Sequence, residues 1–262
     1  MVESTTEKLN LETRGNTAVI TINNPPANTW DADSLQGLTQ LVIDCEADKS
    51  IYAMVLVGSG EKFFSAGADL KLFADGDKTV ARSMAENFGR AFETLAKFRG
   101  VSIAAINGFA MGGGLECALA CDIRIVEQQA LLALPEASVG LLPCGGGTQN
   151  LAWVVGEGWA KRMILCGERV DAQTALSIGL VEEVVDKGQA KGRALELAES
   201  VGGQSPTAVA ACKHLIQQAR TTNISQAYAI ERDSFVDLFD SNDQAEGVNA
   251  FLEKRSPEWT NS

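Results

Sequence analysis

Two glutamates stand in unusual settings in this chain of 262 residues. Glu116 follows three glycines in an otherwise apolar run, FAMGGGLECALA (109–120), and Glu136 follows a proline in LPEASVGLLPCGGGTQ (134–149). Two carboxyl groups with opposite protonation states can share acid and base work. Each also has an ordinary interpretation, as a first-turn helix residue stabilised by the helix dipole.

Two glycine-containing stretches could supply backbone donors. In MGGGLEC (111–117) the glycines precede a predicted helix start, whose unpaired N–H groups can hold an oxyanion. In FFSAGADL (63–70) small residues surround a glycine, which lets a ligand approach the backbone. Neither glycine triplet continues into GK[ST], so a nucleotide P-loop is not expected.

The remaining side chains exclude several kinds of site. His214 is the only histidine, and it lies beside a helical apolar stripe, where we expect it to face solvent. Triads built on Ser-His or Cys-His are therefore not expected. The six cysteines show no CxxC spacing, which indicates reduced thiols in a cytosol rather than disulfides or a metal site, and we predict no bound metal.

Composition limits the partners. The chain is 45% hydrophobic, enough for one sizeable core, and its formal net charge of −12 disfavours nucleic acid as a partner. The N-terminus is polar and mixed in charge, unlike a signal or transit peptide, and no run of about 18 apolar residues is long enough to span a membrane. Any anionic ligand must therefore be held by local donors.

The elements that must position these residues alternate in type. Strands are predicted over 17–22, 52–58, 101–108 and 122–126, and helices from Asp31, over 77–98 and over 114–122. This alternation predicts an α/β fold with parallel crossovers. After residue 185 only helical stripes remain, and such a helical tail serves either as a lid or as an oligomer contact.

Taken together, FSAGADL, INGFAMGGGLECALACDIRI and ALPEASVGLLPCGGGTQNL resemble the crotonase superfamily, and the likeness runs from TAVITINNPPANT to FLEKRSPEW. It implies an enoyl-CoA hydratase/isomerase fold, a repeated ββα superhelix, over residues 1–200. Residues 201–262 would then form a C-terminal helical segment for oligomerisation, in a trimer or a dimer of trimers.

The resemblance also implies roles for the site residues. The amides of Ala68 and Gly113 would form an oxyanion hole for the thioester oxygen. Glu116 and Glu136 would both bind the water in the syn hydration of a trans-2-enoyl-CoA, with Glu136 also delivering the proton to C2. The isomerase branch keeps only the carboxylate that matches Glu136, so the presence of both favours a hydratase.

The same resemblance implies which residues recognise CoA. It also implies that the reaction needs no cofactor beyond the CoA of the substrate. The implied contacts are Ser65, Ala66, Gly67, Asp69 and Leu70, with Ala27 and Asn28 alongside. Phe251 and Lys254 would reach the ligand of a neighbouring subunit, and Cys144 stands where many hydratases have glycine. The segment 71–83 would border the acyl pocket. The resemblance implies a cytoplasmic enzyme without nucleic-acid or membrane partners.

Three alternatives stay open. The same superfamily includes carnitinyl-CoA-type dehydratases and double-bond isomerases, which a panel of substrates would separate from a hydratase. A non-catalytic relative that binds acyl-CoA or RNA is the third, although the chain has no cluster of Lys and Arg.

Overall fold

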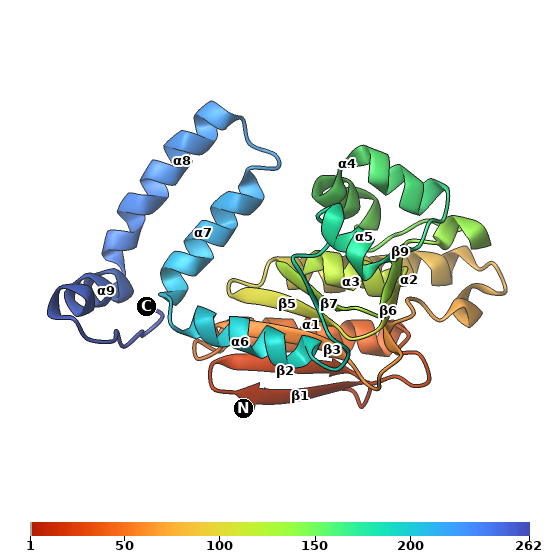
Figure 1. The fold of residues 1–262 in the computed structure, drawn as a ribbon, viewed down its shortest axis with the longest axis horizontal. Coiled ribbons are helices and arrows are strands. Elements are labelled where there is room, and N and C mark those ends of the chain that lie inside the picture. The colour runs from red at the N-terminus through yellow and green to blue at the C-terminus, as the bar shows by residue number, and fades with distance from the viewer. Residues whose placement is uncertain (1) are drawn as a thin grey trace.

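The computed structural model describes residues 2–262 and contains two β-sheets flanked by helices (Figure 1). The larger sheet has the order β1-β2-β3-β5-β7-β10 and is parallel except for the β1–β2 pair. Its strands are β1 (Leu9–Arg14), β2 (Thr17–Ile22), β3 (Ala53–Gly58), β5 (Val101–Ile106), β7 (Ile123–Glu127) and β10 (Glu183–Val185). The four strands predicted from the sequence are confirmed as β2, β3, β5 and β7.

A smaller sheet, in the order β4-β6-β8-β9, was not predicted. Its strands are β4 (Phe63–Ser65), β6 (Phe109–Met111), β8 (Leu131–Ala133) and β9 (Val170–Asp171). Strands of two or three residues are too short to show a period of two, so the sequence pattern carries no signal for them. This sheet nevertheless matters for function, because β4, β6 and β8 each lead directly into a stretch that could do chemistry.

Helices cover both faces of the larger sheet. Along residues 2–262 the helices are α1 (Ala32–Ala47), α2 (Lys78–Ala96), α3 (Gly113–Ala120), α4 (Gly147–Leu165), α5 (Ala172–Ser177), α6 (Ala190–Gly202), α7 (Pro206–Gln218), α8 (Ile224–Asp237) and α9 (Asn242–Glu253), with 3-10 turns η1 (Leu70–Phe73), η2 (Glu136–Val139) and η3 (Leu238–Asp240). The helices predicted from Asp31, over 77–98 and over 114–122 are confirmed as α1, α2 and α3. Asp31 and Asp77 are the N-caps of the first two.

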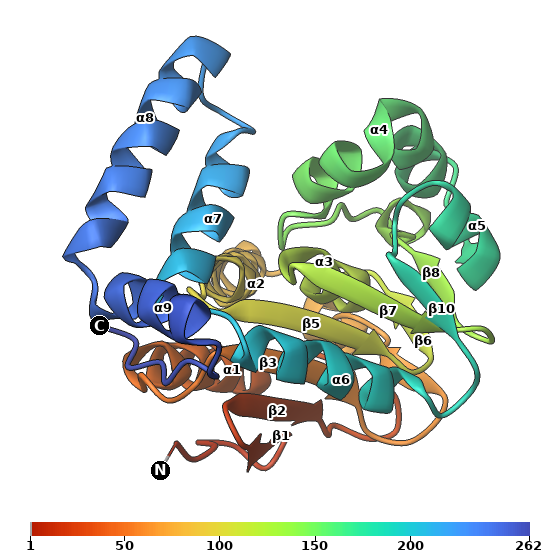
Figure 2. The same cartoon turned by 60° about the vertical axis from the view of Figure 1, so that its left-hand side comes forward.

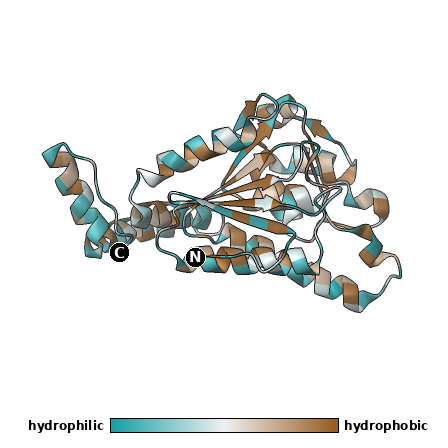
Figure 3. Ribbon diagram, turned by 90° about the horizontal axis from the view of Figure 1, so that it is seen from below, coloured by the Kyte–Doolittle hydropathy of each residue, from teal (hydrophilic) through white to brown (hydrophobic). Residues whose placement is uncertain are grey.

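Alternate residues of the central strands enter two hydrophobic cores. Val19, Val55 and Ile103 pack against the alanines of α6, whereas Ile20 and Leu56 face the main core, which includes residues of α1 and α2. Figure 3 shows the apolar residues concentrated in the sheet between its helical layers. Because both faces are covered, these strands read as continuous apolar runs rather than alternating ones.

The helices α7, α8 and α9 form an arm that projects from the core (Figure 2). α7 is anchored to the core by Lys213, whose Nζ donates to the carbonyl oxygen of Gly100 at 2.9 Å and pairs with Asp122 at 2.7 Å. Farther along the arm the apolar stripes are uncovered, with Ile216 72% and Phe235 63% exposed. Cys212, on the same helix as Ile216, is exposed as well.

Candidate active site

The backbone N–H of Ala68 is left free by its neighbours. Trp30 and Ala68 form an isolated parallel bridge, in which the N–H of Trp30 donates to the Gly67 oxygen at 2.8 Å and the N–H of Asp69 donates to the Trp30 oxygen at 3.1 Å. In such a bridge the amide of the middle residue points to the opposite side. Among residues 2–262 no protein acceptor receives the Ala68 N–H, so it is available to a ligand.

The N–H of Gly113 is available for a different reason. Gly113 is the first residue of α3, and the first N–H groups of a helix have no partner within it. Its position is close-packed, since a Cβ built there would lie 2.7 Å from Cε1 of Phe88. Glycine is therefore required at the start of this helix, and the helix dipole adds positive potential at the same point.

These two amides come from segments in direct contact. Gly67 has φ +87°, and a Cβ added to it would lie 3.0 Å from the Gly113 nitrogen and 2.7 Å from the Met111 oxygen. A residue with a side chain would be strained in this conformation and would push the two segments apart. Gly67 thus allows the segment that carries Ala68 to pack closely against the start of α3 at Gly113.

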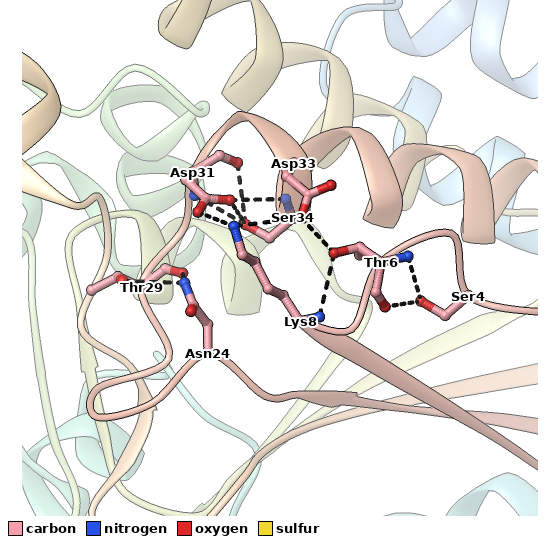
Figure 4. A network of polar contacts seen from close by, with 8 residues as sticks. All are labelled: Ser4, Thr6, Lys8, Asn24, Thr29, Asp31, Asp33 and Ser34. Atoms are coloured by element: carbon pink, nitrogen blue, oxygen red, sulfur yellow. Dashed lines mark hydrogen bonds and ion pairs between the residues drawn. The ribbon is translucent and has the colours of Figure 1, made fainter.

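A polar network fixes the loop that carries Trp30 (Figure 4). The carboxylate of Asp31 accepts from the backbone N–H of Ser34 at 3.0 Å and pairs with Lys8 at 2.5 Å, while Asn24 Nδ2 donates to the Thr29 oxygen at 2.7 Å. Burial works to raise the pKa of Asp31, but the bonds from Lys8 and Ser34 outweigh it and the pKa is lowered. The loop is thereby tied to the start of α1, which steadies the bridge to Ala68.

A cavity of about 540 Å³ adjoins both amides. Of the site residues named from the sequence, its lining includes Ala66, Gly67, Ala68, Leu70, Gly113, Glu116, Glu136 and Cys144. The lining is otherwise largely apolar, and such a cavity with a few converging polar groups is the usual form of a small-molecule site. Stretches spread over eighty residues of sequence therefore meet at one place.

Glu116 is held rigidly at this cavity. Its side chain is 2% exposed, and its Oε1 accepts from the backbone N–H groups of Gly145 and Gly147, each at 2.8 Å. Burial raises the pKa of Glu116, and the backbone donors work against that shift. The glycines are needed here too, because a Cβ on Gly147 would lie 2.9 Å from Oε1. The GGG of 145–147 thus serves as a cradle for a carboxylate rather than for a phosphate.

Glu136 begins η2, directly after Pro135. Its pKa is raised to about 7, mainly by burial, with the charge of Glu116 adding to the effect. Its Oε2 is buried and has no hydrogen-bond partner among residues 2–262, and its Oε1 would lie 2.8 Å from a Cβ placed on Gly112. Glu136 is therefore poised to carry a proton near neutral pH, with one oxygen left for a ligand.

The thiol of Cys144 lies near both acids. Although the residue as a whole is exposed, partial burial of its thiol, together with the charges of Glu116 and Glu136, raises the pKa of Cys144 to about 11. It is consequently protonated at neutral pH, which makes it a poor nucleophile. Among residues 2–262 no three His, Cys, Asp or Glu side chains gather as metal ligands.

Comparison with known proteins agrees with the resemblance found in the sequence. Residues 12–262 match the family model described as "Enoyl-CoA hydratase/isomerase". The chain belongs to this family. A short-chain-enoyl-CoA hydratase of Clostridium acetobutylicum is 37% identical, with 95% of each chain covered, and a carnitinyl-CoA dehydratase of Proteus mirabilis is 36% identical, with 97% of this chain and 98% of that one covered. The solved structure of Pseudomonas aeruginosa DspI is 67% identical with a TM-score of 0.95, covering 97% of both chains.

Membership of the enoyl-CoA hydratase/isomerase family confirms the crotonase-like fold expected from the sequence. Within it, four residues expected to touch CoA, namely Ala27, Asn28, Ser65 and Asp69, are absent from the cavity wall. Ser65 is fully buried and accepts from the Gly67 N–H, and Asn28 donates to the Phe63 oxygen. The Ala27 oxygen accepts from Ala66, and the Asp69 side chain caps η1. Their structural effect is to shape the Gly67–Ala68 backbone.

Phe251 and Lys254 lie at the end of α9 and do not line the cavity of their own chain. Phe251 is 83% exposed, and Lys254 adopts a left-handed conformation at the helix end. The segment 71–83, expected beside the acyl pocket, contributes Phe73 and Ala81 to the lining.

Sequence reasoning missed other parts of the wall. They are Ala85, Phe88, Met111, Gly112, Pro135, Ser138, Val139, Gly140, Leu141 and Leu142. Leu141 and Leu142 are exposed, and this adjacent apolar pair between Gly140 and Pro143 was the signal that the sequence offered.

Proposed function

We propose that this protein is an enoyl-CoA hydratase, a hydro-lyase that adds water to a trans-2-enoyl-CoA to give a 3-hydroxyacyl-CoA. One arrangement carries the proposal. Two free amides, those of Ala68 and Gly113, and two buried carboxyl groups, those of Glu116 and Glu136, border a single cavity. The same reaction is supported by a relative that is named as a short-chain-enoyl-CoA hydratase.

Each group has a role that balances the reaction. Glu116 takes a proton from the water as the water oxygen bonds to C3. The electron pair of the alkene moves toward the thioester oxygen, where the amides of Ala68 and Gly113 stabilise the enolate. Glu136 then gives its proton to C2, and transfer of the proton from Glu116 to Glu136 restores the site. No cofactor is needed beyond the CoA of the substrate.

The direct test is an assay of crotonyl-CoA hydration by the purified protein. The reaction is monitored through the loss of the absorbance of the conjugated enoyl thioester. We expect saturable turnover with 3-hydroxybutyryl-CoA as product. Failure to hydrate any 2-enoyl-CoA from four to sixteen carbons would overturn the proposal.

Carnitinyl-CoA dehydration is the second candidate, supported by the relative of that name at 36% identity. Both reactions use the same pair of acids and differ in the acyl group. Turnover of carnitinyl-CoA with crotonyl-CoA left untouched would favour this candidate. A pure isomerase is disfavoured because both glutamates are present at the cavity.

The rate of hydration is expected to fall as pH rises through about 7. Glu136 donates a proton only while it is neutral, and its pKa is raised to about 7, so the active form is lost above that value. Glu116 must be ionised to accept a proton, and its raised pKa places the acidic limb above pH 4.5. Because the two acids titrate as a pair, the profile reports values of the pair. A pH–kcat/KM profile checks this, and a flat profile from pH 6 to 9 would contradict it.

The exposed arm supports an assembly of several copies, and we propose a trimer or a dimer of trimers. A cleft of about 700 Å³ lies between α7 and the core, with Val154, Val209 and Ile216 in its wall, and a second copy could fill it. Light scattering after size exclusion is expected to give a multiple of three chains.

Lys254→Met should then raise KM for the CoA substrate by about tenfold, the value of one lost charge-assisted bond. A monomer with wild-type KM would contradict both expectations.

No helix within residues 2–262 is long and apolar enough to cross a bilayer. Three cysteines are exposed and unpaired, namely Cys144, Cys166 and Cys212. Exposed free thiols are typical of a reducing compartment, which supports our proposal that the enzyme works in the cytoplasm.

A further inference from the structure

Two glycines of the active site depend on neighbouring aromatic rings for their position. A Cβ built on Gly113 would lie 2.7 Å from Cε1 of Phe88 and 3.5 Å from Cδ1 of Trp30. A Cβ built on Gly145 would lie 2.6 Å from Cδ2 of Phe92. Glycine has no side chain that could anchor its own backbone. The rings that cover these two Cα atoms therefore limit where the Gly113 and Gly145 amides can lie.

The three rings form one buried cluster. Phe88 and Phe92 are one turn apart on α2, with ring centroids 5.7 Å apart, and Phe92 packs edge to face on Trp30 with centroids 5.9 Å apart. Trp30 is 0% exposed, Phe92 1% and Phe88 2%. Protein interiors are packed as densely as organic crystals, so one ring of the cluster cannot move without displacing the next.

Trp30 connects the two oxyanion donors. Its backbone holds the segment around Ala68 through the bridge described above, and its indole lies beside Gly113. The indole N–H is buried and has no acceptor among residues 2–262. An unpaired buried donor costs stability, so the indole contributes through its shape and not through a hydrogen bond. Trp30 does not line the cavity, and any effect on the reaction must pass through the backbone that it supports.

Phe92 supports the third catalytic group, the carboxylate of Glu116. Its ring lies against Gly145, whose N–H donates to Oε1 of Glu116 at 2.8 Å. The Cβ built on Gly145 would also lie 3.2 Å from Oε2 of Glu116, so the ring and the carboxylate both lie close to this glycine. Phe92, like Trp30, does not line the cavity.

We propose that Trp30 and Phe92 are positioning residues for the hydration. Their rings, joined through that of Phe88, fix the two oxyanion donors and the carboxylate of Glu116 relative to one another. This inference rests on the proposed hydratase function. Preorganised donors stabilise a transition state only when they already lie where charge develops, and a displacement of about 1 Å can cost about 10²-fold in rate.

Trp30→Leu is expected to lower kcat for crotonyl-CoA by about tenfold or more while KM changes less than about threefold. Leucine keeps the backbone bridge but removes the ring beside Gly113. Trp30→Phe retains a ring, so it should lose less activity than Trp30→Leu. Acetoacetyl-CoA, a thioester that ionises to an enolate, reports on the donors without turnover. The near-ultraviolet absorbance of its protein-bound enolate should be weaker for Trp30→Leu than for the unaltered protein.

Phe92→Leu should lower kcat by about tenfold and also move the acidic limb of the kcat/KM profile to higher pH. The N–H of Gly145 works to lower the pKa of Glu116, so a loosened cradle lets that pKa rise. Glu116 must be ionised to accept a proton, and activity is then lost earlier as the solution is acidified. The titratable groups that face Glu116, namely Glu136 and Cys144, are unchanged in this variant. Trp30→Leu should leave the limb in place.

A matched control lies just beyond the end of α2. Phe98 is 1% exposed and belongs to the same hydrophobic core, but it does not line the cavity. Phe98→Leu makes the same replacement as Phe92→Leu, so it should lower the melting temperature without changing kcat or the acidic limb.

Circular dichroism identifies the temperature at which each variant is folded. The inference is overturned if folded Trp30→Leu or Phe92→Leu protein keeps the kcat of the unaltered one, or if Phe98→Leu lowers kcat as much as they do. Absence of hydration by the unaltered protein would instead refute the proposed function, and the enolate absorbance would still test the positioning by Trp30.

Discussion

Glu136→Gln is expected to lower kcat for crotonyl-CoA hydration by about 10²–10⁴-fold, and Glu116→Gln by a comparable factor, the usual contribution of a positioned acid or base. Glutamine has the shape of glutamate but can neither give up nor accept a proton at neutral pH. The Glu116 variant should keep its fold, because an amide oxygen can still accept from the N–H groups of Gly145 and Gly147.

The double variant distinguishes joint action from two separate contributions. If the two acids act on one water, the loss in Glu116→Gln/Glu136→Gln should be far smaller than the product of the single losses. Glu199→Gln, which removes an exposed carboxylate on α6, should retain wild-type kcat. Single glutamine variants that hydrate crotonyl-CoA at near-normal rates would rule out the mechanism proposed above.

Gly113→Ala is expected to lower kcat by about 10²-fold. A Cβ at this position would lie 2.7 Å from Cε1 of Phe88, whose ring is buried, so the start of α3 must shift. Removing a single oxyanion donor costs about 10²–10³-fold in kcat, and a displaced donor loses much of that value. Steady-state kinetics with crotonyl-CoA checks the effect, with KM changing less than kcat.

Two measurements separate this effect from unfolding. The variant should also lose about 1–3 kcal/mol of stability, as expected for an overpacked core, so kinetics must be compared at a temperature where circular dichroism shows it folded. Gly158→Ala is the matched control, because a Cβ there has no neighbour within 4 Å. Wild-type kcat in a folded Gly113→Ala protein would show that the Gly113 amide does not serve the reaction.

Long periodic segments made much of the fold predictable. The apolar stripe of 77–98 and the run at 101–108 became α2 and β5 within two residues at each end. The smaller sheet was unpredictable, because its strands are held by neighbours far apart in sequence and have little pattern of their own. The exposure of Cys212 and Phe235 could not be predicted either. An apolar stripe has the same sequence pattern whether it packs against its own chain or against another one.

The sequence by itself determined which chemical groups this protein has. It supplies Glu116 and Glu136, glycines where only a bare backbone fits, and a single histidine, His214, which is exposed and lies on α7. Residue types and short spacings are local properties, so they can be read along the chain. The family resemblance also pointed to the amides of Ala68 and Gly113, two residues that line the cavity.

Only the tertiary structure decided what those groups can do. The proton affinity of Glu136 depends on burial and on a carboxylate twenty residues away in sequence, and the freedom of the Ala68 amide depends on a bridge to Trp30. Solvation and steric access depend on which atoms surround a group in space, and that is fixed only when the chain has folded.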